Sequence, residues 1–417
     1  MNILWGLMGI IVILGIAFLL SSNRKAIKPR TILGGLAIQI LFAYIALYSE
    51  AGRWVLLQLT EVVNAIVGYT GEGIDFLFGG LFEAEGIGMI FVVEILTLVI
   101  FFSSLISILY YLGIMQFVIK ILGGALSWLL GTSKTESLSA AANIFVGQTE
   151  APLVVKPFIG SMTRSELFAV MTGGLASVAG SVLIGYSELG VPLEYLLAAS
   201  FMAAPSGLVM AKMMMPEVDP ENTADKKDVE MEEDKESYNV IDAAARGAST
   251  GLQLVLNIAA MLLAFIALIA LVNGGLGVVQ SAINWIIGVF GSGFTLEGLT
   301  LENILGVLFA PLAFVIGVPW SEALQAGTFV GQKLVLNEFV AYANFAPEID
   351  SYDPKTALIV SFALCGFANL SSLGILLGGL GKLAPSRRGD IAQLGVKAIA
   401  AGALASLLNA SIAGMFF

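Results

Sequence analysis

The chain has 417 residues, 58% of them hydrophobic and only 12% charged, and its formal net charge is −11. Soluble domains carry about 25% charged residues, so this composition excludes an ordinary soluble fold and predicts an all-α polytopic membrane protein. Histidine is absent from the whole sequence. This excludes Ser-His dyads, histidine-ligated metals and imidazole proton relays, and leaves carboxylates, amides, hydroxyls and the backbone to carry any chemistry.

The N-terminal third of the chain predicts three spans and two interfacial segments. An apolar run at residues 3–20 lacks a basic start and a small-residue cleavage site, and four basic residues follow it at 24–30. We therefore expect a retained first helix whose C-terminal end lies in the cytoplasm. After it we expect a second span, an external interfacial segment, a third span and an amphipathic inner-surface stretch, at 31–49, 51–85, 87–112 and 113–131.

The rest of the chain predicts five more full spans, near 164–186, 193–215, 249–273, 357–381 and 391–416. Residues 217–236 hold ten acidic side chains and three lysines, which favours a solvated cytoplasmic loop over a binding tail. Most lysines and arginines fall on the cytoplasmic side of this layout, in agreement with the positive-inside rule, and only Arg53, Lys333 and Lys355 fall outside. We therefore expect eight spans with both termini outside, in the cell inner (plasma) membrane.

Two less regular apolar blocks, near 137–160 and 321–345, share the sequence F-V-G-Q at 145–148 and 329–332. Each block is followed by a span that contains small and polar residues. Three predicted spans separate the blocks, and this odd number inverts the second copy relative to the first. Paired, interrupted segments in inverted repeats are the best sequence indicator of a transporter's binding site.

Both blocks predict re-entrant hairpins, because non-helical backbone at membrane depth survives only inside protein or beside a wet cavity. The tips would carry Gln148, Thr149 and Glu150 in the first hairpin, and Asn337 and Glu338 in the second. An ionised carboxylate is costly in hydrocarbon, so the two glutamates favour a functional role. The alternative is structural, with each glutamate capping a hairpin or pairing with a nearby lysine, Lys156 or Lys333.

The polar groups near these tips favour a neutral ligand. Only two cations lie close by, whereas an anionic substrate would need several fixed positive groups or helix N-termini. The available carboxylates, amides, hydroxyls and aromatic ring suit a small solute with hydroxyls, amide-like donors and a flat face, although a sugar or a zwitterion would also fit. No basic patch suits nucleic acid, so the expected surroundings are membrane lipid.

Three segments resemble the concentrative nucleoside transporter family: G-Q-T-E-A-P-L at 147–153, N-E-F-V-A-Y at 337–342 and S-F-A-L-C-G-F-A-N-L-S-S at 361–372. The likeness extends over nearly the whole chain. It implies eight transmembrane helices, two opposed re-entrant hairpins in inverted repeats, and interfacial helices. It also implies a homotrimer with a central scaffold and mobile outer transport domains.

By that likeness, the first hairpin would bind the nucleobase, and the second hairpin with the span after it would bind the ribose. The implied base contacts are Gln148, Thr149, Glu150 and Val182. The implied ribose ligands are Glu338, Asn369 and Ser372, with Phe367 pressed against the bound nucleoside. The family's sodium site would map to the side chains of Asn143 and Ser177 and to the backbone carbonyls of Val146, Ser177 and Val178.

The predicted organisation has five parts. They are scaffold-type N-terminal helices, a first transport repeat, an acidic cytoplasmic loop, a scaffold helix and a second transport repeat, at 1–112, 113–215, 216–248, 249–273 and 274–417. The function expected is import of nucleosides such as uridine by sodium symport with alternating access, with no cofactor beyond the coupling ion. The alternatives are a proton-coupled nucleoside carrier, a channel, or a membrane-embedded enzyme that uses Glu150 or Glu338.

Overall fold

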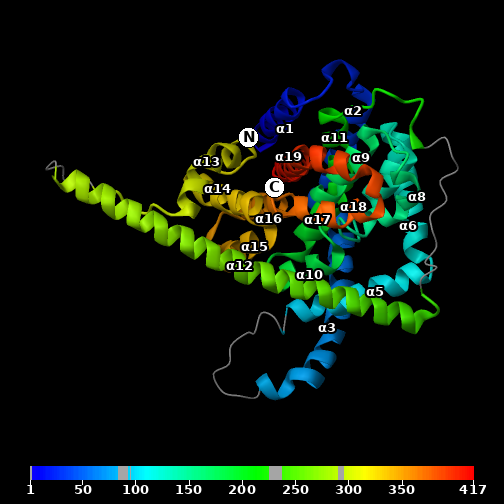
Figure 1. Cartoon of the computed structure of the whole chain (residues 1–417), viewed down its shortest axis with the longest axis horizontal. Coiled ribbons are helices and arrows are strands. Elements are labelled where there is room, and N and C mark those ends of the chain that lie inside the picture. Colours follow the sequence, from blue (N-terminus) through cyan, green and yellow to red (C-terminus); the bar gives the residue numbers. More distant parts are fainter. Residues whose placement is uncertain (1, 83–92, 94, 225–236, 290–294) are drawn as a thin grey trace.

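The computed structural model describes residues 2–82, 93, 95–224, 237–289 and 295–417, and every regular element in these residues is helical (Figure 1). The predicted all-α class is therefore confirmed. Six of the described helices are long and apolar enough to cross a membrane, and counting two sharply bent pairs as one span each raises the number to eight. The beginning of the predicted third span and most of the predicted acidic loop, at 87–92, 94 and 225–236, lie outside the described residues.

The buried centre consists of three helices that pack against one another: α9 (Arg164–Ala176), α11 (Leu193–Met214) and α19 (Arg388–Ala413). Small residues allow this close packing, since a Cβ at Gly207 of α11 would lie only 3.3 Å from the Gly173 backbone of α9. Outside this centre, α1 (Asn2–Leu19) lies against α19, and α2 (Pro29–Ala43) lies against α11.

The two ends of the chain meet. The Asn2 side-chain amide donates a hydrogen bond of 2.8 Å to the carbonyl of Phe417. Both termini therefore lie on the same side of the molecule, which an even number of membrane crossings requires.

Two helices form a separate pair along one side of the molecule, α5 (Leu96–Tyr111) and α12 (Val240–Val289). With 50 residues, α12 is about 75 Å long, far more than the roughly 30 Å core of a bilayer, and Figure 1 shows it projecting beyond the other helices. The predicted span at 249–273 covers only its middle. Gly274 and Gly275 resemble a helix end in the sequence, but the helix continues through them, and it already begins within the segment predicted as loop.

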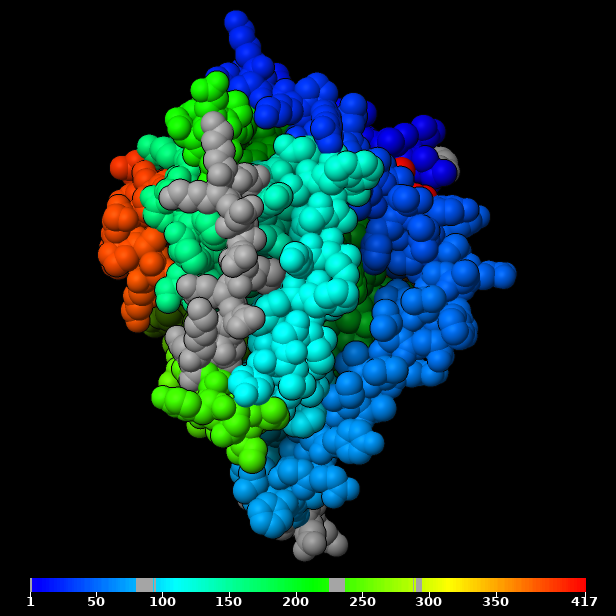
Figure 2. Space-filling view, turned by 90° about the vertical axis from the view of Figure 1, so that its right-hand side faces the viewer, coloured from blue at the N-terminus to red at the C-terminus, as the bar shows by residue number. Residues whose placement is uncertain are grey.

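The predicted interfacial segments are single helices. The segment 51–85 corresponds to α3 (Glu50–Phe82), and 113–131 corresponds to α6 (Ile114–Leu130). Helix α6 is bent by 80° from α5 at Gly113, whose φ of 76° favours glycine. In Figure 2 α6, in cyan, runs along the viewed face of the molecule, and the blue segments of α2 and α3 lie to its right.

Both predicted hairpins are interrupted helices. The first consists of α7 (Lys134–Ala142), a largely non-helical break at 143–150, η3 (Ala151–Val155) and α8 (Lys156–Ile159). Its first arm starts at a capping box, in which Ser133 and Glu136 each bond the other's backbone N–H. The second hairpin consists of α14 (Trp320–Val335) and α15 (Glu338–Phe345), separated by a break of two residues.

Two spans that we expected to be continuous are also interrupted. The span 164–186 is divided at 177–179 into α9 and α10 (Gly180–Glu188). The span 357–381 is divided at 365–371, between α16 (Pro354–Leu364) and α17 (Ser372–Gly378), and continues into α18 (Leu380–Leu383). Side chains bond the freed backbone groups: the Ser406 hydroxyl donates to the Cys365 carbonyl at 3.1 Å.

One helix was missed as a separate element, α13 (Leu301–Val315). It packs along α14 and is bent from it by 117° at Gly317, whose φ is 116°. Short helical turns complete the described chain: η1 (Arg24–Ala26), η2 (Tyr44–Tyr48), η5 (Ala346–Ser351) and η6 (Pro385–Arg387).

Candidate functional site

Glu338 is bonded to residues of both broken spans. It begins α15 directly after the break of the second hairpin, and it is 6% exposed. One carboxylate oxygen accepts a hydrogen bond from the Tyr186 hydroxyl of α10 at 3.2 Å, and the other accepts from the Asn369 side-chain amide at 2.9 Å. One donor lies on α10 and the other in the break between α16 and α17, so the carboxylate is held where both broken spans converge.

Asn369 is fixed in turn by two serines. Its amide oxygen accepts hydrogen bonds from the Ser371 hydroxyl at 2.6 Å and from the Ser372 backbone N–H at 3.0 Å. The Ser372 hydroxyl lies between this oxygen and the carbonyl of Phe367. The arrangement turns the Asn369 amide group toward Glu338 and gathers a carboxylate, an amide and hydroxyls at the start of α17, which suits a hydroxyl-rich ligand.

Two buried amide oxygens near the first hairpin have no donor among the described residues, Asn143 Oδ1 and Gln148 Oε1. The Asn143 amide nitrogen bonds the Ser139 carbonyl of its own helix at 2.9 Å, which leaves the oxygen facing elsewhere. Both side chains lie beside Gly174 of α9, where a Cβ would be 2.8 Å from the Gln148 Cβ. Buried acceptors without donors are rare in native proteins, so this pair indicates a place for a cation or a donor-bearing ligand.

The backbone breaks of α9–α10 and α16–α17 are joined to each other. The Ser177 carbonyl accepts a hydrogen bond from the Phe367 N–H at 3.1 Å, while the Ser177 hydroxyl donates to the Gly173 carbonyl at 3.0 Å. Val178 lies in the first of these breaks and Val146 in the break of the first hairpin, and both are buried. Asn143 and Ser177 are thus brought to the same turn of α9, although neither side chain bonds the other in the described part of the chain.

Thr149 and Glu150 form the tip of the first hairpin. The Thr149 hydroxyl donates to a Glu150 carboxylate oxygen at 3.1 Å, and Thr149 also lies against Gly379, just after α17. Glu150, together with Val146, lines a cavity of about 570 Å³ between this hairpin, α5 and α12. That volume falls within the range of about 300–1,000 Å³ that is usual for small-molecule pockets.

The two glutamates occupy different surroundings. Glu338 lies in the hydrogen-bonded cluster of Tyr186 and Asn369, whereas Glu150 faces the cavity, and no hydrogen bond joins them within the described residues. Among the described residues, neither glutamate forms an ion pair with Lys156 or Lys333. The structural alternative in which each glutamate pairs with a nearby lysine is therefore not observed.

Lys333, one of the two cations expected near the hairpin tips, is buried inside the protein. It is 2% exposed, and its ammonium group donates to the Ala363 carbonyl near the end of α16 at 2.7 Å. A helix that ends inside a membrane protein leaves carbonyls that need donors, and the lysine supplies one.

Sequence reasoning also missed Tyr186, the second donor to Glu338. The spacing from Val182, a predicted base contact, could have indicated Tyr186. Tyr186 lies four residues after Val182 on the same helix, and residues at this spacing project from the same face. Both side chains are buried, with 0% and 1% exposure, so α10 presents one buried face to the site.

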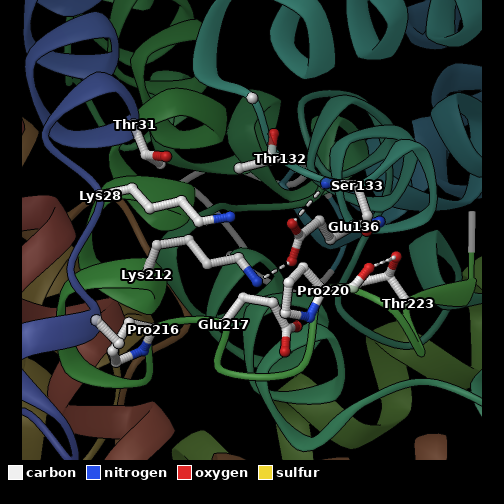
Figure 3. A pocket seen from close by; sticks show the side chains of 12 residues that line it. Lys28, Thr31, Thr132, Ser133, Glu136, Lys212, Pro216, Glu217, Pro220 and Thr223 are labelled. Atoms are coloured by element: carbon white, nitrogen blue, oxygen red, sulfur yellow. Dashed lines mark hydrogen bonds and ion pairs between the residues drawn. The ribbon is translucent and has the colours of Figure 1, made fainter.

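A second cavity, of about 160 Å³, is lined by residues from the chain after α1, the start of the first hairpin and the segment after α11 (Figure 3). At its centre Lys212 forms an ion pair of 2.5 Å with Glu136 and donates to the Ser165 hydroxyl at 2.8 Å. Glu136 also accepts from the Ser133 N–H at 2.8 Å. Lys212 and Glu136 are thus paired within the protein. The larger cavity, which Glu150 lines, and the helix breaks beside it are therefore the better candidate site.

Three family models match successive parts of the chain. Residues 8–81 match "Na+ dependent nucleoside transporter N-terminus", residues 92–192 match "Nucleoside recognition", and residues 195–414 match "Na+ dependent nucleoside transporter C-terminus". The matched ranges include both hairpins and both broken spans.

Similar proteins cover the chain from end to end. It is 59% identical to "Uncharacterized transporter YutK" of Bacillus subtilis, with 100% of both proteins covered. It is 48% identical to "Nucleoside permease NupC" of Helicobacter pylori, over 99% of this chain and 97% of that protein. A solved structure of CNTnw in an inward-facing substrate-bound state is 51% identical, with a TM-score of 0.90, covering 100% of this chain and 98% of that one.

Proposed function

Because this chain belongs to the concentrative nucleoside transporter family, we propose that it imports nucleosides such as uridine across the cell inner membrane by sodium symport. The members of the family are transporters and permeases, so a membrane-embedded enzyme that uses Glu150 or Glu338 is excluded. The observation that carries the proposal is the cluster of Glu338, Asn369 and Ser372, three polar groups held together by helix breaks at membrane depth.

The ribose is the part of the substrate that this cluster recognises. Each Glu338 oxygen already accepts one hydrogen bond and retains a further lone pair for a sugar hydroxyl. Asn369 and Ser372 add an amide and a hydroxyl beside it. A buried site that bonds a substrate hydroxyl discriminates strongly against analogues without it, because its own polar groups are then left unpaired.

The nucleobase is held from the first hairpin. Gln148 has a buried amide oxygen without a donor, and Thr149 and Glu150 follow it at the tip beside the large cavity. Val182 and Phe367 supply apolar contacts from the two broken spans. An amide oxygen and a carboxylate can accept hydrogen bonds from the N–H groups of a nucleobase. The cavity beside Glu150 gives the ligand a path to the site.

Sodium is the coupling ion in this proposal. Its ligands are the side-chain oxygens of Asn143 and Ser177 and the carbonyls of Val146, Ser177 and Val178. The unpartnered Asn143 oxygen supports this site, and neutral oxygens from unwound backbone suit a hard alkali cation. The description of the matching family model as Na+ dependent supports the same ion.

Alternating access follows from the two inverted, interrupted repeats. The transport domain, which carries both hairpins, would move against the α5–α12 pair of the scaffold and expose the site first to one side of the membrane and then to the other. Helix α12 is apolar and mostly exposed along its length, which supports a homotrimer in which this helix belongs to a central scaffold.

The decisive experiment is uptake of radiolabelled uridine into proteoliposomes under an inward sodium gradient or a proton gradient. We expect sodium-driven, saturable uptake that Glu338→Gln reduces at least about tenfold, since it removes a charged acceptor worth more than roughly 1.4 kcal/mol. Glu188→Gln, at the end of the same α10 that carries Tyr186, is the matched control and should transport normally.

The other outcomes separate the parts of the proposal. Proton-driven uptake would retain the nucleoside site and overturn the sodium assignment. Uptake that does not saturate would indicate a channel. No uptake under either gradient by correctly folded protein would overturn the function itself.

A further inference from the structure

Tyr186 is a buried side chain whose single polar atom is aimed at Glu338. Its hydroxyl donates to one oxygen of the carboxylate at 3.2 Å, and the side chain has 0% exposure. Its ring stacks on Tyr342 with centroids 4.4 Å apart and meets Phe339 edge-on at 5.1 Å. The ring contacts fix the direction in which the hydroxyl points.

The carboxylate of Glu338 depends on this donor for its orientation. The terminal torsion of a glutamate is broad, so a carboxylate held at one oxygen only can rotate. Asn369 holds one oxygen from the second repeat, and Tyr186 holds the other from the first. Loss of the Tyr186 hydroxyl would leave one buried oxygen without its donor and release the rotation of the group.

The position of Tyr186 on α10 ties it to the rest of the site. Helix α10 begins just after the break at 177–179, which is bonded to the second broken span through the Ser177 carbonyl and Phe367 N–H. Val182 lies one turn before Tyr186 on the same face. One short helix therefore carries a proposed base contact and the donor that holds the proposed ribose ligand.

We propose that Tyr186 is a positioning residue for ribose recognition, which holds the Glu338 carboxylate in the orientation that accepts sugar hydroxyls. Tyr186 does not contact the sugar itself. The inference rests on the proposed function, because it requires that Glu338 binds the ribose. It assigns to Tyr186 part of the discrimination between ribonucleosides and deoxyribonucleosides.

A matched control stands next to Tyr186 in the same aromatic stack. Tyr342 is equally buried, and its hydroxyl donates to the backbone carbonyl of Ser361 at 2.7 Å rather than to Glu338. Tyr186→Phe and Tyr342→Phe each remove one buried hydroxyl from this stack. Only the first removes a bond to the proposed ribose ligand.

The test is the KM for uptake of uridine, 2′-deoxyuridine and 3′-deoxyuridine by the wild type and both variants, each shown by size-exclusion profile and Tm to be folded. We expect Tyr186→Phe to raise the KM for uridine at least about tenfold, which corresponds to roughly 1.4 kcal/mol, the lower end of what one hydrogen bond to a charged group contributes. The KM for the deoxynucleoside that lacks the hydroxyl bound by Glu338 should rise less than about twofold. Tyr342→Phe should leave the ratio of these KM values unchanged.

A double-variant cycle provides a second readout. In the Glu338→Gln background, Tyr186→Phe should change the uridine to deoxyuridine ratio no further, because the two residues act as a unit. Equal KM increases for all three nucleosides, or the same ratio shift in Tyr342→Phe, would overturn the inference while leaving the proposed function intact. If Glu338→Gln itself leaves every KM unchanged, the ribose assignment fails first, and the inference fails with it.

Discussion

At the scale of single residues, two neighbouring glycines at the end of α17 differ in the space around them. A Cβ at Gly379 would lie 2.7 Å from the Thr149 Cγ2 and 3.2 Å from the Ile375 carbonyl, whereas a Cβ at Gly378 meets nothing within 4 Å. Thr149 is β-branched and stiff, so it cannot move aside without shifting the tip of the first hairpin.

We therefore expect Gly379→Ala to displace Thr149 and raise the KM for uridine several-fold, at least about threefold, a cost of the size found for overpacking. Gly378→Ala should have little effect on uptake, because its methyl group enters open space. Parallel uptake assays on the two variants check this. Equal effects would mean that Thr149 does not contribute to nucleoside binding.

The buried oxygen of Asn143 gives a prediction for the coupling ion. Asn143→Leu conserves the volume of the side chain and removes the unpartnered oxygen, so we expect the apparent affinity for sodium to fall at least about tenfold. Initial uptake rates over a series of sodium concentrations measure this. The control is Asn409→Leu, on α19, a buried asparagine bonded to Ser206 outside the site. Unchanged sodium dependence in Asn143→Leu would contradict the proposed ligand set.

The motifs of the sequence predicted Glu338, Asn369 and Ser372 as a group, and the structure does bring these three together. The bond from Tyr186 to Glu338 and the bond from Lys333 to the Ala363 carbonyl were not predicted. These contacts cross from one repeat or one helix to another, and a hydrogen bond between distant segments leaves no local pattern in the sequence. The roles of all these residues in binding and coupling stay predictions.

At the scale of helices, one buried ion pair joins the first hairpin to the core. Lys212 of α11 pairs with Glu136 of α7 at 2.5 Å and also bonds Ser165 of α9 (Figure 3). Three elements therefore meet at one ammonium group. Both side chains are more than 90% buried, so removal of one partner leaves the other charge without compensation.

We expect Lys212→Met to lower the free energy of unfolding by about 3–5 kcal/mol, and the double variant Lys212→Met with Glu136→Leu to recover most of the loss. The pair of Arg164 and Asp390, 3.7 Å apart, is the control, because its side chains are 54% and 28% exposed and breaking it should cost less than about 1 kcal/mol. Thermal unfolding in detergent measures all three. No recovery in the double variant would show that the lysine acts other than through Glu136.

Hydropathy and paired motifs were sufficient to predict the two hairpins but not the breaks in two of the long spans. Runs at 164–186 and 357–381 are apolar enough to resemble continuous helices. Their interruptions are bonded by groups from elsewhere in the fold, the Phe367 N–H at Ser177 and the Ser406 hydroxyl at Cys365. The predicted span at 249–273 also underestimated α12, which continues beyond it at both ends, from Val240 to Val289.

At the scale of the whole molecule, α12 carries a stripe of large exposed side chains that no other described helix covers. Leu256, Leu263, Leu271 and Val278 follow one another at intervals of seven or eight residues, and each is at least 60% exposed. This spacing places them on one face of the helix. The face either contacts lipid alone or packs against the same helix of other copies, and the proposed homotrimer requires the second arrangement.

The sequence offers a simple way to decide between lipid and protein contact, because its one cysteine, Cys365, is buried. Single cysteines placed along the stripe, at Leu256, Leu263, Leu271 and Val278, should include at least one position that forms a disulfide-linked dimer in native membranes. The geometry demands this if copies of α12 meet at an axis, since Cα atoms must approach within about 7 Å for a disulfide to form.

Phe117→Cys, on α6, supplies the comparison, because Phe117 is an equally apolar side chain with 67% exposure on a different helix. It should remain unlinked under the same oxidation, and native mass spectrometry of the purified protein should give the mass of three chains. Linking at Phe117 alone would place the interface on α6. A monomeric mass without linking at any stripe position would mean that α12 faces only lipid and that one copy of the chain supplies its own scaffold.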